Sequence, residues 1–342
     1  MTSQISGEGG ERSMVEFPGS CPQKGSPLLK AVEVLAIDTG RPNAVRPIMG
    51  PGVDGAALLV SIAGAEPVIR GWDLSTGASL WSSMEELPDC NDAVLVGLPD
   101  GRRILAVSTE DGVERWDALT GDPLDLLDSS DWTIWGMKSA SFPDNRTVLL
   151  GAGQNHAIYR WDLATGEQVG APLRGHNTSV LSVEFIRLST TDSVIVSGDD
   201  AGYLRRWDAV TGAAIGLPVE GHSSAVRAIS HLATTGGGRL FASSDAHGEI
   251  SRWDAVTGER VGEPLATTSD VHLLATACPS GTPLLLAAGA SGTIRTWHAY
   301  TGELIDLSLS GVSVAALDQP DGTTLVAAGT AQGEIKVYSV SE

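Results

Sequence analysis

The 342-residue sequence is poor in cysteine and has no long apolar run, and each shortage excludes a class of protein. Its three cysteines, Cys21, Cys90 and Cys278, are odd in number and far apart, which excludes a disulfide framework and a local cysteine metal motif. No apolar run approaches the roughly 18 residues that span a bilayer. The first residues also lack the basic and apolar regions of a secretory signal. We therefore expect a cytoplasmic protein with reduced thiols and no membrane association.

Positive charge is scarce as well. The formal net charge is −20, and only four of the 22 basic residues are lysine. Nucleic-acid binding requires clustered positive charge, so this composition argues against it. The acidity instead favours solubility and a basic partner. The excess of arginine over lysine is typical of a GC-rich genome, from which we expect a bacterial origin.

What the sequence does contain is a repeated phrase, Trp-Asp followed three residues later by Thr-Gly. Seven aromatic residues mark the repeat: Trp72, Trp116, Trp161, Trp207, Trp253, Trp297 and Tyr338. Trp297 is followed by His in place of Asp, and Tyr338 belongs to a degenerate copy of the phrase. The steps between them are 44, 45, 46, 46, 44 and 41 residues. A period of about 40–45 residues is typical of repeated β-modules. We therefore predict seven modules in one domain over residues 29–342.

Each repeat carries four strand signals separated by Pro, Asp and Gly turn residues. In the fourth repeat these signals cover residues 180–185, 194–197, 204–208 and 213–219. The last repeat stops after its third strand, which would leave an unpaired sheet edge. We predict that the segment Val32 to Ile37 supplies the missing outer strand and closes a ring. Residues 1–28 are rich in Gly, Ser, Glu and Pro without periodicity, and we expect a disordered tail there.

With these motifs the chain resembles a WD40-repeat β-propeller. The resemblance implies an all-β fold of seven four-stranded antiparallel blades, closed by the N-terminal strand that completes the last blade. It also implies buried structural roles for Trp72, Trp116, Trp161, Trp207, Trp253, Trp297, His176 and His222. In the family such a histidine joins a relay with a strand Ser and the Trp indole, here Ser197 with Trp207 and Ser243 with Trp253. In the family the relay also contains an Asp in a turn. The matching positions here hold Ala201 and His247, and Asp199 and Asp245, two residues earlier, are the candidate substitutes.

Family members often bind partners on the loops that lead into the inner strands and on the turns before the third strands. This implies the partner-binding candidates Arg41, Asn43, Asp89, Asp131, Trp132, Trp135, His156, Asn177, Asp200 and His247. Trp132 and Trp135 stand where the fourth repeat has Gly-His, and two tryptophans in one entering loop exceed what the repeat requires. Aromatic residues are enriched at binding hot spots. The alternative is that Trp132 packs in place of the missing histidine and only Trp135 is accessible.

Catalytic motifs are missing from the sequence. It has no G-x-S-x-G elbow, phosphate loop or H-E-x-x-H. The loop histidines belong to different repeats without ligand spacing, so we predict no metal and no cofactor. The arginines one or two places before the repeat tryptophans are expected to lay their stems along neighbouring sheets and to pair with acids. We predict a monomeric, noncatalytic scaffold that binds a protein or peptide. The alternative is a small-ligand-binding or catalytic propeller that uses Trp132, Trp135, His156, His247 and nearby carboxylates at the mouth of a central channel.

Overall fold

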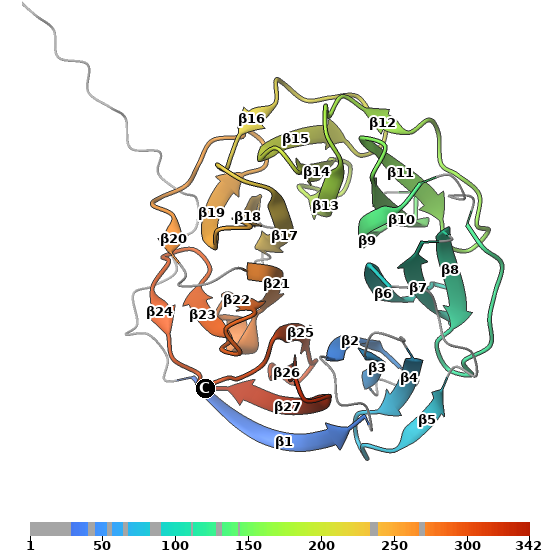
Figure 1. Ribbon diagram of the computed structural model, residues 1–342, viewed down its shortest axis with the longest axis vertical. Coiled ribbons are helices and arrows are strands. Elements are labelled where there is room, and N and C mark those ends of the chain that lie inside the picture. The colour runs from blue at the N-terminus through green and yellow to red at the C-terminus, as the bar shows by residue number, and fades with distance from the viewer. Residues whose placement is uncertain are drawn as a thin grey trace, which may run out of the picture.

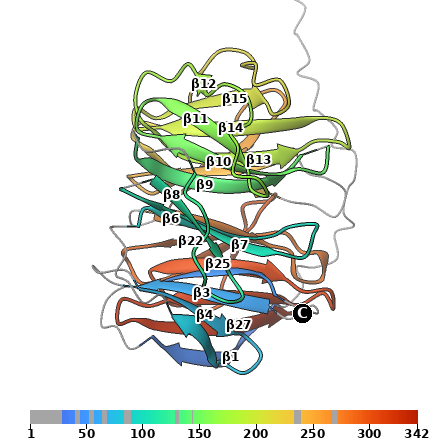
Figure 2. The same ribbon diagram turned by 90° about the vertical axis from the view of Figure 1, so that its right-hand side faces the viewer.

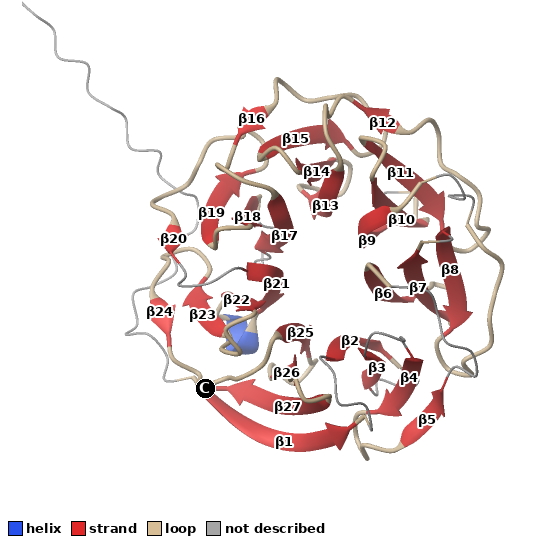
Figure 3. Ribbon diagram, viewed as in Figure 1, coloured by secondary structure: helices blue, strands red, loops and turns tan. Residues whose placement is uncertain are grey.

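The chain forms a ring of seven antiparallel sheets around a central opening (Figure 1). The computed structural model describes residues 29–39, 45–52, 57–63, 68–82, 90–110, 112–127, 132–142, 144–232, 239–266 and 271–342. Within these residues the only helix is the single 3-10 turn η1 (Pro279–Gly281), and Figure 3 shows strands in every blade. The expected all-β, seven-bladed propeller is confirmed. The tail expected over residues 1–28 lies outside the described residues.

Each blade begins with a strand at the centre of the ring and continues outward along the chain. Blades one to three are built as follows: β2 (Val45–Pro51), β3 (Ala57–Ala63), β4 (Val68–Asp73) and β5 (Ser79–Ser82); β6 (Asp92–Gly97), β7 (Arg103–Thr109) and β8 (Gly112–Asp117); β9 (Ile134–Ser141), β10 (Thr147–Gly153), β11 (Ala157–Asp162) and β12 (Leu173–Arg174).

Blades four to six have four strands each, and blade seven has three of its own. Their bounds are as follows: β13 (Val180–Arg187), β14 (Ser193–Asp199), β15 (Tyr203–Asp208) and β16 (Val219–Glu220); β17 (Val226–Leu232), β18 (Leu240–Asp245), β19 (Glu249–Asp254) and β20 (Leu265–Ala266); β21 (Val271–Ala277), β22 (Leu284–Gly289), β23 (Arg295–His298) and β24 (Leu304–Ile305); β25 (Ser313–Asp318), β26 (Thr324–Gly329) and β27 (Glu334–Ser341).

The outer strands are shorter than the sequence predicts. The outer strand expected over residues 213–219 is reduced to the two-residue β16, with one isolated bridge between Trp207 and Ala214. Blade two has no regular fourth strand among its described residues. There, isolated bridges join Trp116 to Pro123 and Val113 to Leu127. Pro123 has no N–H to donate, which prevents a continuous ladder at that position.

The ring closes through β1 (Lys30–Asp38), as predicted. This strand pairs antiparallel with β27, from Lys30 opposite Ser341 to Asp38 opposite Glu334. Figures 1 and 2 show β1 along the outside of β27, so the first described strand completes the last blade. The backbone N–H and the side-chain hydroxyl of Thr39 then donate to the carbonyl of Gly333, at 3.2 and 2.6 Å.

The hydrophobic core lies between neighbouring blades. The six repeat tryptophans are buried, with exposed fractions from 0% at Trp161 to 8% at Trp116. The cluster around Trp207 of blade four also contains Val148 and Leu150 of blade three. Each indole thus fills space between two twisted sheets, which explains why a large aromatic residue recurs once per repeat.

The polar part of the repeated phrase forms a turn. In blade one the carboxylate of Asp73 accepts hydrogen bonds from the backbone N–H groups of Ser75 and Thr76, at 2.7 and 3.2 Å. Gly77 follows with φ of +71°, a left-handed conformation that suits glycine. The hydrogen bonds from Ser75 lower the pKa of Asp73. In blade six, His298 replaces the aspartate, and its Nδ1 accepts the N–H of Thr301 at 3.2 Å.

The arginines directly before four of the tryptophans link adjacent blades. They do so through backbone carbonyls of the next blade, as in Arg115 to Leu163 (3.0 Å), Arg160 to Ala209 (3.2 Å), Arg206 to Ala255 (3.2 Å) and Arg252 to Tyr300 (2.6 Å). The expectation that these four arginines pair with acids is wrong for the described residues, where no ion pair includes them. Burial lowers the pKa of each.

Candidate functional site: the upper face and the channel mouth

Two sets of loops meet on one side of the ring, which we call the upper face. It comprises the segments that lead into the inner strands and the turns between the second and third strands. Backbone hydrogen bonds join the two sets in blades three, four and five: Gln154 N–H to Thr133 O, Asp200 N–H to Ser179 O and Ala246 N–H to Ala225 O, at 2.9, 3.0 and 3.0 Å. The candidate residues can therefore be placed relative to one another.

Five of the predicted partner-binding residues are exposed on the upper face: Trp132, His156, Asn177, Asp200 and His247. Trp132 is 43% exposed, so it does not take the buried packing position that the alternative reading gave it. Arg41, Asn43, Asp89 and Asp131 lie outside the described residues.

Trp135 is not a loop residue, in contrast to the sequence prediction. It is the second residue of β9, and its side chain, 39% exposed, lines the central channel. The hydrogen bond between Gln154 and Thr133 connects the turn that carries His156 to the segment between the two tryptophans. Blade three thus places one tryptophan on the upper face and the other inside the channel mouth.

The residue type at His156 departs from its counterparts, although the left-handed backbone is the same. His156 has φ of +66°, whereas glycine occupies the position five residues before the repeat aromatic in blades four to seven: Gly202, Gly248, Gly292 and Gly333, with φ from +73° to +90°. A residue with a Cβ in the left-handed region costs on the order of 1–3 kcal/mol. Such outliers cluster at functional sites, which makes His156 the most distinctive residue of this turn.

The two relay histidines are buried below the upper face. In blade four, His176 contacts Asp199 through Nδ1 at 2.8 Å and Ser197 through Nε2 at 2.7 Å. The indole N–H of Trp207 donates to the same Ser197 hydroxyl at 2.9 Å. Asp199 therefore takes the place of the turn aspartate that the sequence lacks at Ala201. Burial opposes ionisation of Asp199, but the hydrogen bonds from His176 and from the backbone of Tyr203 lower its pKa.

Blade five has the same relay with one link missing. His222 Nε2 contacts Ser243 at 2.6 Å, and Trp253 donates to that hydroxyl at 2.7 Å. The distance from His222 Nδ1 to Asp245 is 3.8 Å, too long for a hydrogen bond, and this nitrogen has no partner among the described residues. Burial lowers the pKa of His222, and the nearby carboxylates of Asp245 and Glu249 offset this only in part.

The channel mouth contains a cavity of about 390 Å³ lined by the inner strands of blades one to six. The second residue of each of these strands contributes to its wall: Arg46, Ala93, Trp135, Leu181, Arg227 and His272. The volume is in the range of small-molecule and side-chain pockets. His156 and His247 do not line it, so they are not part of the cavity wall that contains Trp135.

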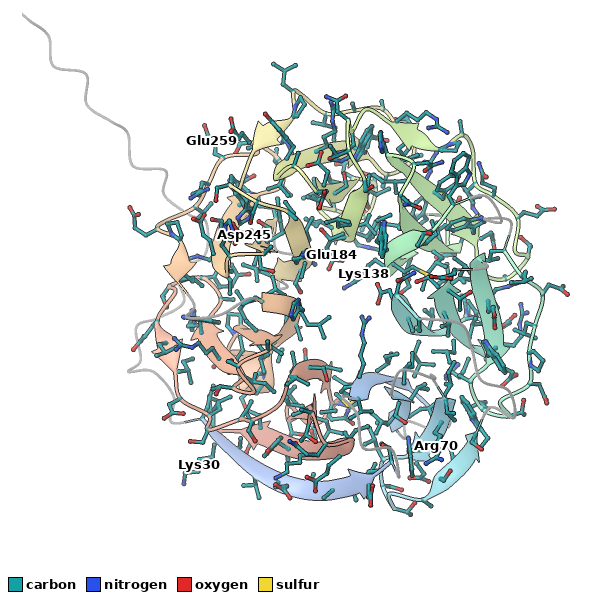
Figure 4. All side chains as sticks on the ribbon, in the orientation of Figure 1. Lys30, Arg70, Lys138, Glu184, Asp245 and Glu259 are labelled. Carbon is teal, nitrogen blue, oxygen red and sulfur yellow. The ribbon has the colours of Figure 1, made fainter. Side chains whose placement is uncertain are left out.

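Two carboxylates are buried in the channel wall and hold cations at its surface. Asp92 forms an ion pair with Arg46 and accepts the N–H of Met137 at 2.6 Å. Glu184 pairs with Lys138 at 2.8 Å, and Figure 4 labels both on the inner wall of the ring. The side chain of Glu184 is 1% exposed and that of Lys138 43% exposed. Solvent in the channel therefore meets mainly the cationic partners.

Other candidate chemistry is sparse. Among the described residues no group of three or more His, Cys, Asp and Glu side chains is arranged to hold a metal ion. Burial raises the pKa of the Cys90 thiol to about 12, which disfavours the nucleophilic thiolate at neutral pH. No helix in the described ranges is both long and apolar enough to cross a membrane.

Sequence reasoning missed two features of the site. One is Tyr203, which is 38% exposed at the start of β15, beside the turn of Asp200. The other is the set of channel cations, since Arg46, Lys138 and Arg227 are far apart in the sequence. For Arg46 and Arg227 the usable signal was register, because each inner strand starts about 45 residues after the previous one and the second residues of these strands could have been aligned. Lys138 is the fifth residue of β9, so this alignment would not have found it.

Comparisons with known proteins agree with this geometry. A family model for the WD domain, G-beta repeat (WD40), matches residues 166–208, which cover most of blade four. The chain is a seven-bladed propeller with a WD40 repeat. No curated protein matches it.

A solved structure matches most of the chain. The crystal structure of the computationally designed Ika8 protein is 20% identical in sequence, with a TM-score of 0.61, and the alignment covers 90% of this chain and 99% of that one. At this identity the likeness concerns the fold alone. WD40 propellers commonly serve as protein-interaction scaffolds.

Proposed function

We propose that this WD40 propeller is a noncatalytic scaffold that binds a protein or peptide on its upper face, centred on blade three. The observation that carries the proposal is the departure of this blade from its own repeat. It exposes Trp132 on the face and Trp135 in the channel, and it holds His156 where blades four to seven have glycine. Exposed tryptophan is the residue type most enriched at binding hot spots.

Several features of the partner follow from charge and from the sequence. The net charge of −20 favours a partner with basic regions and opposes nucleic acid. For the chain itself, the monomeric state, the cytoplasmic location and the bacterial origin remain predictions. Asn177, Asp200 and His247 are exposed on blades four and five and would extend the contact from blade three.

The proposal is tested by affinity capture from the native cell with wild-type and variant baits. Trp132→Ala and Trp135→Ala should each reduce the captured partner about tenfold or more, as expected for hot-spot residues. His156→Gly should also weaken capture, while the melting temperature stays level or rises because the left-handed backbone is relieved.

The matched control is Leu304→Ala, which removes an apolar side chain that is 59% exposed on the outer strand of blade six. This variant should capture the partner as the wild type does. Capture that is equal for the wild type, Trp132→Ala and Trp135→Ala, with all three folded, contradicts the proposal.

A small ligand in the channel is the second candidate, and the position of Trp135 in the cavity wall favours it. Such a ligand would change the fluorescence of Trp135. A titration in which Trp135→Ala abolishes the spectral change, while capture of protein by Trp132→Ala is unaffected, would favour this candidate over the scaffold.

A further inference from the structure

Four consecutive inner strands start with the same irregularity. In β9, β13, β17 and β21 the pairing with the next strand skips the second residue, which is a β-bulge: Trp135, Leu181, Arg227 and His272. The inner strands β2, β6 and β25 pair without such a skip. Bulges re-aim side chains and are frequent beside binding sites.

The four extra residues all line the cavity and follow one another around the ring. Trp135 and Leu181 form an apolar part of the wall, Arg227 forms the part that carries a cation, and His272 follows it around the ring. Trp135, Arg227 and His272 are exposed, and Leu181 is partly exposed. One half of this arc suits an apolar group and the other half suits an anion.

Arg227 differs from the other cations of the channel. Arg46 and Lys138 are each paired with a buried carboxylate, Asp92 and Glu184. Arg227 is exposed and, within the described part of the chain, has no ion-pair or hydrogen-bond partner. Its guanidinium group can therefore form charge-assisted hydrogen bonds with an incoming carboxylate, which are stronger than neutral ones.

We propose that the channel mouth accepts an acidic side chain of the bound peptide, with its carboxylate on Arg227 and a neighbouring apolar side chain against Trp135 and Leu181. This deepens, and rests on, the proposed scaffold function, because it names the chemistry of the segment that enters the ring. A wholly acidic peptide is disfavoured by the net charge of −20. The occupant is therefore a single acidic residue within an otherwise neutral or basic segment.

The test uses two fluorescein-labelled probes, Lys-Lys-Leu-Glu-Leu-Lys-Lys and the same peptide with Gln at its centre. Fluorescence anisotropy gives the Kd of each for the full chain. The Glu probe should bind about tenfold more tightly, as expected for one charge-assisted hydrogen bond. Arg227→Gln should abolish this preference, and Arg227→Lys should keep most of it. Trp135→Ala should weaken both probes equally.

Arg146→Gln is the matched control, since it removes the same charge from the turn between β9 and β10, at the other end of the inner strand. It should leave the preference unchanged. Equal Kd values for the two probes on the wild type overturn the proposal, as does an equal effect of Arg227→Gln and Arg146→Gln. Binding of inorganic phosphate without a preference for the Glu probe also overturns it and indicates a small-anion site. Any of these results leaves the scaffold proposal standing if capture still depends on Trp132.

Discussion

His176 and His222 occupy equivalent positions but differ in one hydrogen bond. His176 contacts both a serine and an aspartate, whereas His222 contacts only the serine. The aspartate near His222, Asp245, accepts the backbone N–H groups of His247 and Glu249 through its other oxygen. A relay can therefore look complete in the sequence and lack a link in the structure, because 1 Å of displacement removes a hydrogen bond.

This difference predicts a pH effect. Burial lowers the pKa of His222 in the folded chain below its ordinary value of 6.5. As the pH falls through that range, the unfolded chain binds the proton more readily, so the free energy of unfolding decreases. Denaturant unfolding at pH 7.5 and 5.5 should show that His222→Gln is less stable at pH 7.5 but loses less stability on acidification than the wild type.

His247→Gln is the matched control for the His222 variant, because it removes an exposed histidine from the same blade. Equal changes in the pH dependence of both variants would show that the burial of His222 is not the cause.

At the scale of strands and blades, most of the fold could be predicted. The Trp-Asp-x-x-Thr-Gly spacing predicts the third strand and its turn, because both the buried indole and the turn carboxylate are needed once per blade. The lengths of the outer strands could not be predicted, since they depend on how far each twisted edge stays within hydrogen-bonding distance. The prediction that Trp135 lies in a loop was wrong for a related reason. A bulge depends on pairing between two strands, and neither strand shows it alone.

The closing strand gives a stability prediction. Ile37 of β1 is 4% exposed and packs with Val45 and Ile335. Ile37→Ala should therefore lower the free energy of unfolding by about 2–5 kcal/mol. Deleting residues 29–39 should lower the melting temperature much further, since it removes the whole β1–β27 ladder.

Val34→Ala serves as the control for Ile37→Ala, because Val34 is 54% exposed on the same strand. Its effect should stay within about 0.5 kcal/mol, as is usual for surface substitutions. Unchanged melting after the deletion would refute the role of β1 in closure.

For the whole molecule, charge is the property with the widest reach. The 342-residue chain carries a net charge of −20, and repulsion between like charges opposes the compact state. Exposed ion pairs such as Arg146 with Asp144 contribute little that salt could weaken. Screening should therefore stabilise the protein, and the melting temperature should rise by a few degrees between 10 and 300 mM NaCl.

Sucrose is the comparison for that experiment. It is uncharged, so it stabilises the folded protein without screening the repulsion between charges. If charge repulsion matters, neutralising acidic surface residues should reduce the effect of NaCl and leave the effect of sucrose unchanged. A melting temperature that is flat or falls with NaCl would contradict the prediction.

The pairing of Lys30 with Ser341 has a consequence during synthesis on the ribosome. β1 emerges first of all the described strands, and its partner β27 is translated about 300 residues later. At roughly 5–20 residues per second the nascent chain carries this unpaired strand for on the order of 15–60 s. Val32 and Val34 are exposed on it even in the finished protein. Among the described strands, β1 would therefore need the protection of a chaperone that binds apolar nascent segments for the longest time.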